Sequence, residues 1–135
     1  MTSGIDSGIR HTGDALDRRT PYVPSPLLYG DALCFLKHYQ GFLTCVQAQS
    51  GKPLFGPRRL PGIRNVFASP VGAADRMYIV DRAGATVVLE RGAEFKLLAR
   101  NQLDDSFSAS PAVVGNDLYL RGERNLYCIA EDPGE

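Results

Sequence analysis

The cysteines are the most reactive side chains in the sequence, at positions Cys34, Cys45 and Cys128. Their spacing matches neither the Cys-x-x-Cys pattern of zinc sites nor the dense pattern of a disulfide-stabilised scaffold. Cys34 and Cys45 could form a disulfide between paired strands in an oxidising compartment, or they could remain free thiols that fill an apolar face. We prefer the free thiols, because buried cysteines behave as small apolar residues.

Oxygen and nitrogen ligands for a metal ion are sparse. Asn101, Asp104 and Asp105 lie close together in the sequence, and clustered oxygen ligands suit calcium. No glycine-containing calcium loop surrounds them, so we expect a solvated aspartate pair that caps a turn. His11 and His38 are far apart in the sequence, which gives no support for a two-histidine site. The sequence therefore predicts no metal site.

Catalytic motifs are not found either. There is no Gly-x-Ser-x-Gly nucleophile elbow, and no serine or cysteine has a predictable histidine and aspartate beside it. The glycines stand singly at turns rather than in a phosphate-binding loop. We therefore predict no catalytic residues, and a protein that is not an enzyme.

One local run of positive charge remains, made of Lys52, Arg58, Arg59 and Arg64 with prolines between them. It falls on a connection between two repeated units. We interpret it as a solvated loop, and the alternative is a contact patch for an acidic protein partner, because loops often carry binding residues.

Composition limits the classes of function. The chain has 135 residues, which suits one domain, and its 15 basic and 15 acidic residues cancel. A neutral chain has no overall field to attract nucleic acid, so we expect none as a partner. No apolar run reaches the roughly 18–20 residues that cross a bilayer. The first twenty residues lack the charged and apolar order of a signal peptide, which places the chain in the cytoplasm or makes it part of a longer protein.

The elements that must position these side chains come from a repeat. Ser-Pro steps at Ser25-Pro26, Ser69-Pro70 and Ser110-Pro111 begin three copies of one pattern, 44 and then 41 residues apart. Each copy contains apolar runs of four to seven residues bounded by Gly, Asp or Asn, which predicts short strands. The copies span about 23–60, 67–103 and 107–131, and the third lacks a last strand. Residues 1–20 are predicted as a flexible lead with at most one edge strand at Ala15-Leu16, and 132–135 as a polar tail.

The predicted hairpins agree with one another in register. Pairing Lys37 with Phe42 across a four-residue turn places Cys34 opposite Cys45. The same rule places Tyr78 near Leu89 and Tyr119 near Cys128 in the second and third copies, each a favourable cross-strand pair. Four short strands every forty or so residues are typical of β-propeller blades. The predicted fold is all-β, a partial propeller of about three blades, four-stranded except the last.

The motifs within the repeat resemble the pyrrolo-quinoline-quinone-like (PQQ-like) repeat over residues 21–131. The likeness is strongest at Ala48-x-x-Gly51-Lys52-x-Leu54-Phe55, at Ser69-Pro70 with Met77-Tyr78-Ile79, and at Ser110-Pro111 with Leu118-Tyr119-Leu120 and Leu126-Tyr127. That family includes quinoprotein alcohol dehydrogenases and the propeller lipoprotein of outer-membrane β-barrel assembly. The resemblance implies that Phe55 stands at the family's tryptophan docking position.

The resemblance also implies a larger protein. Family propellers close with seven or eight blades, and three blades would leave two open edges and the apolar faces that should meet further blades. We therefore expect a C-terminal fragment of a periplasmic or secreted parent, whose partners are the remaining blades, a self-association partner or another protein.

Enzymes of this family hold a quinone with calcium, a vicinal disulfide and a stacking tryptophan. This chain has no Cys-Cys pair and no Trp, so we expect no cofactor. The expected function is a non-catalytic module that binds protein or ligand. The alternative is a fragment of a quinoprotein dehydrogenase whose cofactor residues lie outside this chain.

Overall fold

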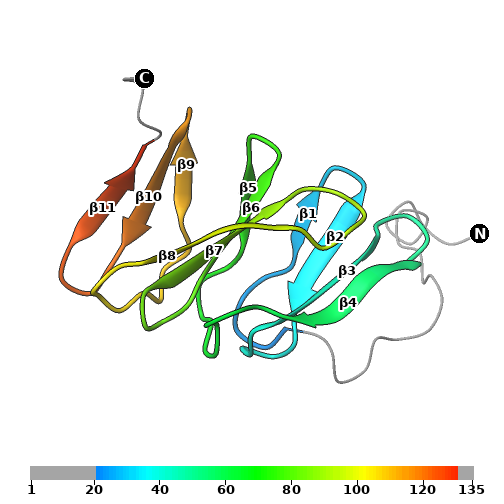
Figure 1. Ribbon diagram of the computed structural model, residues 1–135, viewed down its shortest axis with the longest axis horizontal. Helices are drawn as coiled ribbons and strands as arrows, with labels where there is room; N and C mark the ends of the chain where they lie inside the picture. The colour runs from blue at the N-terminus through cyan, green and yellow to red at the C-terminus, as the bar shows by residue number, and fades with distance from the viewer. Residues whose placement is uncertain (1–20, 131–135) are drawn as a thin grey trace, which may run out of the picture.

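The computed structural model describes residues 21–130, and these form three antiparallel sheets without a helix (Figure 1). We call the sheets blades 1, 2 and 3. Blade 1 has the order β1 (Leu27–Tyr29), β2 (Ala32–Leu36), β3 (Phe42–Gln47), β4 (Pro53–Arg59), and blade 2 has β5 (Val71–Ala73), β6 (Arg76–Val80), β7 (Ala85–Glu90), β8 (Leu97–Gln102). Blade 3 has β9 (Ala112–Val114), β10 (Asp117–Arg121) and β11 (Leu126–Ile129). The prediction of an all-β partial propeller with a three-stranded last sheet is confirmed. The calls on residues 1–20 and 132–135 lie outside the described residues.

The first hairpin of each blade turns through left-handed backbone. Gly30 supplies this conformation in blade 1 with a φ of 63°, and Gly115 supplies it in blade 3 with a φ of 60°. Blade 2 uses Ala74 and Asp75 instead, at φ values of 49° and 62°. The Asp75 amide donates to the hydroxyl of Tyr29 at 2.8 Å, and this bond to blade 1 helps to hold a turn that lacks glycine.

The second hairpin of each blade tests the predicted registers. Cys34 lies opposite Cys45 and Tyr119 lies opposite Cys128, as predicted. The prediction for blade 2 is wrong by one residue, because Tyr78 pairs with Val88 rather than with Leu89. The cause is a shorter turn: the Asp81 amide donates to the carbonyl of Ala85 at 2.7 Å, so three residues lie between this bonded pair, one fewer than the four between Lys37 and Phe42 in blade 1.

Two apolar clusters lie between the blades, and β6 contributes to both. Met77 and Ile79 point toward blade 1 and belong to the larger cluster, while Val80 on the other face of β6 belongs to the smaller one. The larger cluster comprises Cys34, Leu36, Leu43, Cys45, Leu60, Ile63, Val66, Met77, Ile79, Ala85, Val87 and Leu89. The smaller comprises Ala68, Val80, Phe107, Leu118 and Leu120. Each cluster covers sheet faces that would be exposed to solvent in an isolated blade.

The two outer faces of the stack differ. On blade 1 the outward side chains Phe35 and Val46 are buried. On blade 3 the outward side chains Val114 and Leu126 are 62% and 65% exposed. The expectation that apolar faces are open at both ends is therefore right for blade 3 and wrong for these residues of blade 1.

Residues 21–130 contain no helix that is long and apolar enough to span a bilayer.

Candidate functional site

The β2–β3, β6–β7 and β10–β11 turns and the connections between blades meet on one face, which we call the turn face. It comprises the turns at 37–41, 81–85 and 121–125 and the connections at 60–70 and 103–111. Four backbone hydrogen bonds join these segments, from Val66 to Tyr39 (2.7 Å), Arg82 to Asn65 (2.8 Å), Phe107 to Arg82 (3.0 Å) and Glu123 to Ser106 (2.8 Å), each written from amide to carbonyl. At each junction, an amide of the connection donates to the turn of the preceding blade, and an amide of the following turn donates to the connection. The repeat therefore forms this face from the same backbone hydrogen bonds at both junctions.

A buried carboxylate reinforces the junction of blades 1 and 2. Asp81 directly follows β6 and is 3% exposed. One of its oxygens accepts hydrogen bonds from the amides of Arg64 and Asn65 at 2.8 and 2.7 Å, and the other accepts from the amide of Ala83 at 2.8 Å. A carboxylate on the turn thus holds the connection that enters blade 2.

At the junction of blades 2 and 3, a second buried carboxylate lies on the connection and accepts hydrogen bonds from the turn. Asp105 belongs to the connection, and it accepts from the amides of Ser106 (2.8 Å), Arg124 (3.2 Å) and Asn125 (3.1 Å) and from the hydroxyl of Tyr127 (3.1 Å). Desolvation of the carboxyl acts to raise its pKa, but these hydrogen bonds stabilise the charged form and bring the pKa down to about 2. Here the connection holds the turn.

The three members of the acidic cluster lie in different environments. Asp105 caps a turn, as predicted, but it is not solvated, because its side chain is 1% exposed. Asp104 is exposed, and Asn101 lies on β8. No group of three potential metal-ligating side chains gathers within residues 21–130.

An aromatic and cationic cluster stands on the turn face between blades 1 and 2. The Arg82 guanidinium lies 4.4 Å from the centre of the Phe67 ring, and Tyr39 meets the same ring edge-on at 6.4 Å. Tyr39 is 42% exposed. Two polar atoms at this junction, Asn65 Oδ1 and Arg82 Nε, are buried without a hydrogen-bond partner among the described residues. We call Tyr39, Phe67 and Arg82 the Arg82 cluster.

The Arg82 cluster was not predicted from the sequence. Its members come from two turns and one connection, far apart along the chain, and only the repeat brings them together. The available signal was the pair of large aromatic residues, Tyr39 and Phe67, in segments that form no strand.

The basic residues chosen from the sequence are partly brought together. Lys52 precedes β4, while Arg58 and Arg59 end it near the turn face. Arg58 stacks on Phe95 at 4.4 Å and Arg59 on Phe42 at 5.3 Å. Arg64 is exposed in the connection. Arg59 and Arg64 therefore lie toward the turn face, whereas the Arg58 side chain contacts the β7–β8 connection and Lys52 lies at the other end of β4.

The cysteines of blade 1 form a disulfide, with an S–S distance of 2.03 Å between Cys34 and Cys45. The preference for free thiols is wrong for this pair, whose direct cross-strand position allows the bond. Cys128 is free and exposed.

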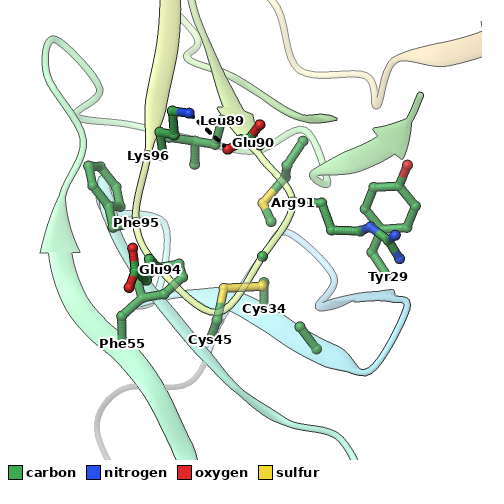
Figure 2. A pocket seen from close by; sticks show the side chains of 13 residues that line it. Tyr29, Cys34, Cys45, Phe55, Leu89, Glu90, Arg91, Glu94, Phe95 and Lys96 are labelled. Carbon is green, nitrogen blue, oxygen red and sulfur yellow. Dashed lines mark ion pairs between the residues drawn. A yellow bond between two sulfur atoms is a disulfide. The ribbon is translucent and has the colours of Figure 1, made fainter. Parts of the chain in front are cut away.

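Beside the disulfide lies a small cavity between blades 1 and 2. Figure 2 shows the disulfide with Phe55 and Phe95 at its edge. The two rings meet edge-on at 5.8 Å, and only about 10 Å³ remains, which is space for about one water. Phe55, at the predicted docking position, therefore fills the space between the blades.

Comparison with known proteins supports the fold. No protein-family model matches the chain, and no curated protein sequence matches it. Among solved structures, BamB from Moraxella catarrhalis is similar over 81% of this chain, with a TM-score of 0.62 and 15% sequence identity. The chain spans 31% of the length of that structure. At this identity the likeness shows a propeller-type fold.

Proposed function

We propose that this chain is a non-catalytic section of a β-propeller within a larger extracytoplasmic protein, and that it binds a protein partner through the turn face. The observation that carries the proposal is the Arg82 cluster, in which an arginine stacks on an aromatic ring beside an exposed tyrosine. Arginine and tyrosine are the residue types that most often dominate binding energy at protein interfaces.

The physical setting of the cluster favours binding. Arg82 and Tyr39 both lie on turns whose backbones are bonded to the neighbouring connection. A side chain on a backbone that is already ordered loses less conformational entropy when a partner docks. Stacking covers the face of the guanidinium and leaves its edge for hydrogen bonds to a carboxylate. The partner that fits carries an acidic residue next to an apolar one.

Arg59 and Arg64 extend this chemistry. They lie toward the same face and are exposed, so they would add long-range attraction for an acidic partner. Arg58 is also exposed, but its guanidinium lies on Phe95 in the β7–β8 connection. Lys52 lies at the opposite end of β4 and is expected to contribute little.

The compartment and the parent protein follow from other observations. A buried disulfide in a small sheet supports an oxidising compartment, such as the periplasm or the extracellular space. The likeness to BamB over 31% of its length supports a parent with further blades. The resemblance of the motifs to the PQQ-like repeat supports the same parent.

The test is capture with the full chain. The chain is immobilised and exposed to the periplasmic and secreted fraction of its source cells, beside a Tyr39→Ser, Arg82→Ser double variant and a Lys52→Ser control. We expect at least one acidic protein to be retained by the native chain and the control and lost by the double variant. The candidate is then titrated in purified form, where the double variant should weaken binding by about 2 kcal/mol or more.

Circular dichroism and thermal unfolding show whether the double variant is folded. Capture that is equal for the native chain and the folded double variant would refute the turn face as the binding site.

A further inference from the structure

A second candidate site lies between blades 2 and 3, away from the turn face. It is a groove of about 350 Å³, with β8 on one side and β11 on the other. Its apolar lining comes from Tyr78, Val88 and Ala99 of blade 2 and from Leu118 and Ile129 of blade 3. Polar side chains also line it, namely Arg76, Asn101, Asn116 and Asp117.

The corresponding place between blades 1 and 2 is filled. There Phe55 of β4 and Phe95 reduce the space to about 10 Å³. The registers show why the next groove stays open. Phe55 is opposite Cys45, and Ala99 is opposite Val88, so Ala99 takes the position of Phe55 with a single methyl group. Blade 3 has no fourth strand among the described residues, so none of the strands in residues 21–130 enters the groove from that side.

The free edge of blade 3 lacks the features that protect the other outer edges. On β4, prolines at positions 53 and 57 and two register shifts interrupt the edge, and on β8 there are a register shift and Arg100. By contrast, β11 has no proline, charge or register shift. Its Ile129 is 42% exposed. Regular unprotected edges accept further strands.

We propose that this groove and the β11 edge bind one extended strand from a partner protein, antiparallel to β11. Blade 2 gives the register, because Leu97 of β8 lies opposite Leu89 and Leu89 lies opposite Met77. Ile129 lies opposite Leu118 in the same way. The bound strand therefore places a large apolar side chain opposite Ile129, directed into the groove. It continues the interface of blades 2 and 3 as β8 continues that of blades 1 and 2.

The shape of the groove favours a single strand over a second copy of this chain. Leu98 and Ala99 of β8 line the groove together with Ile129, so β8 already stands over the place beside β11. In a dimer joined through two β11 edges, each blade 2 would cover its own β11 from the same side of the shared sheet. The two second blades would then collide, whereas a lone strand fits beneath β8.

The probe is a synthetic peptide with the sequence of residues 95–103, FKLLARNQL, which contains the fourth strand of blade 2. Fluorescence anisotropy follows its binding to the full chain. We expect saturable binding, and a Leu97→Asp peptide should bind about tenfold more weakly or worse. Hydrogen exchange of the segment Leu126–Ile129 should slow when the native peptide is added, because strand pairing protects backbone amides.

Four variants of the chain locate the site, two in the groove and two outside it. Ile129→Asp places a charge in the groove, and Ala99→Trp fills it, so each should weaken binding of the native peptide by about tenfold or more. Val114→Lys adds a charge on the other face of blade 3 and should leave binding unchanged. Arg82→Ser should also leave it unchanged, which separates this site from the turn face.

The proposal fails if the groove variants bind the peptide as the native chain does, or if β11 exchange does not change. It also fails if β11 is already protected in the chain alone. Protection that rises with protein concentration would identify a second copy, and protection independent of concentration would show that the chain covers its own edge.

Discussion

The Cys34–Cys45 disulfide gives the sharpest test of the structure. The two residues are 11 positions apart, and cross-linking a loop of this size removes conformational entropy from the unfolded chain worth about 3 kcal/mol. We therefore expect the reduced chain to be less stable than the oxidised chain by this amount. With a urea dependence of about 2 kcal/mol per molar, the unfolding midpoint should fall by about 1.5 M.

The assay compares oxidised chain with chain that has been reduced and refolded in reductant, because no atoms other than two hydrogens then differ. A Cys34→Ala, Cys45→Ala variant should have a free energy of unfolding about 1–2 kcal/mol below that of the reduced chain. Both sulfurs are buried, and their removal leaves a cavity. Cys128→Ser is the control and should change stability by about 0.5 kcal/mol or less, because Cys128 is exposed.

Thiol titration supplies the decisive result. In denaturant without reductant the chain should show one reactive thiol, that of Cys128, because the other two cysteines are bonded. Three reactive thiols, or equal urea midpoints for the oxidised and reduced chains, would refute the reasoning.

Three further predictions concern the junctions between blades. The pKa of Asp105 is lowered to about 2 in the folded chain, so its stabilising effect is present above pH about 4 and is lost as the pH falls toward 2. In the Asp105→Asn variant, the urea midpoint should therefore change less between about pH 4 and pH 2 than in the native chain. Phe55→Ala should cost about 2 kcal/mol in urea unfolding, because a half-buried ring leaves the space between blades 1 and 2. Gly41→Ala should cost about 1–3 kcal/mol, because the new methyl group overlaps the carbonyl of Ile63, whereas Gly92→Ala, with open space around it, should cost little. Equal thermal stability of the two alanine variants would contradict the packing at this junction.

The repeat made most of the fold predictable. Ser-Pro steps, glycine turns and alternating apolar residues locate every strand to within a few residues, because a small sheet with two covered faces tolerates few other patterns. The register of blade 2 was missed because Ala85 is apolar and fits either a turn or a strand. Only the hydrogen bond from Asp81 to Ala85 decides that the strand begins there.

The candidate site was much less predictable, for a physical reason. The aspartate at position 105 looks in sequence like a solvated turn residue, and it becomes a buried cap only because the amides of Arg124 and Asn125 face it from the next blade. The Arg82 cluster likewise depends on bonds between blades. Local patterns specify strands, whereas the contacts between segments that build the turn face join residues 15 to 28 positions apart.

The division of the core into two clusters of unequal size predicts that the chain unfolds in steps. The larger cluster joins blades 1 and 2 with 12 buried residues, while the smaller joins blade 3 with five. Blade 3 should therefore detach in a partial unfolding event of lower free energy, before the pair of blades 1 and 2 separates. In native-state hydrogen exchange, β9–β11 should form one early cooperative unit and β2–β3 with β6–β7 a later one. A partner that binds folded blade 3 would then raise the free energy of this first unfolding step.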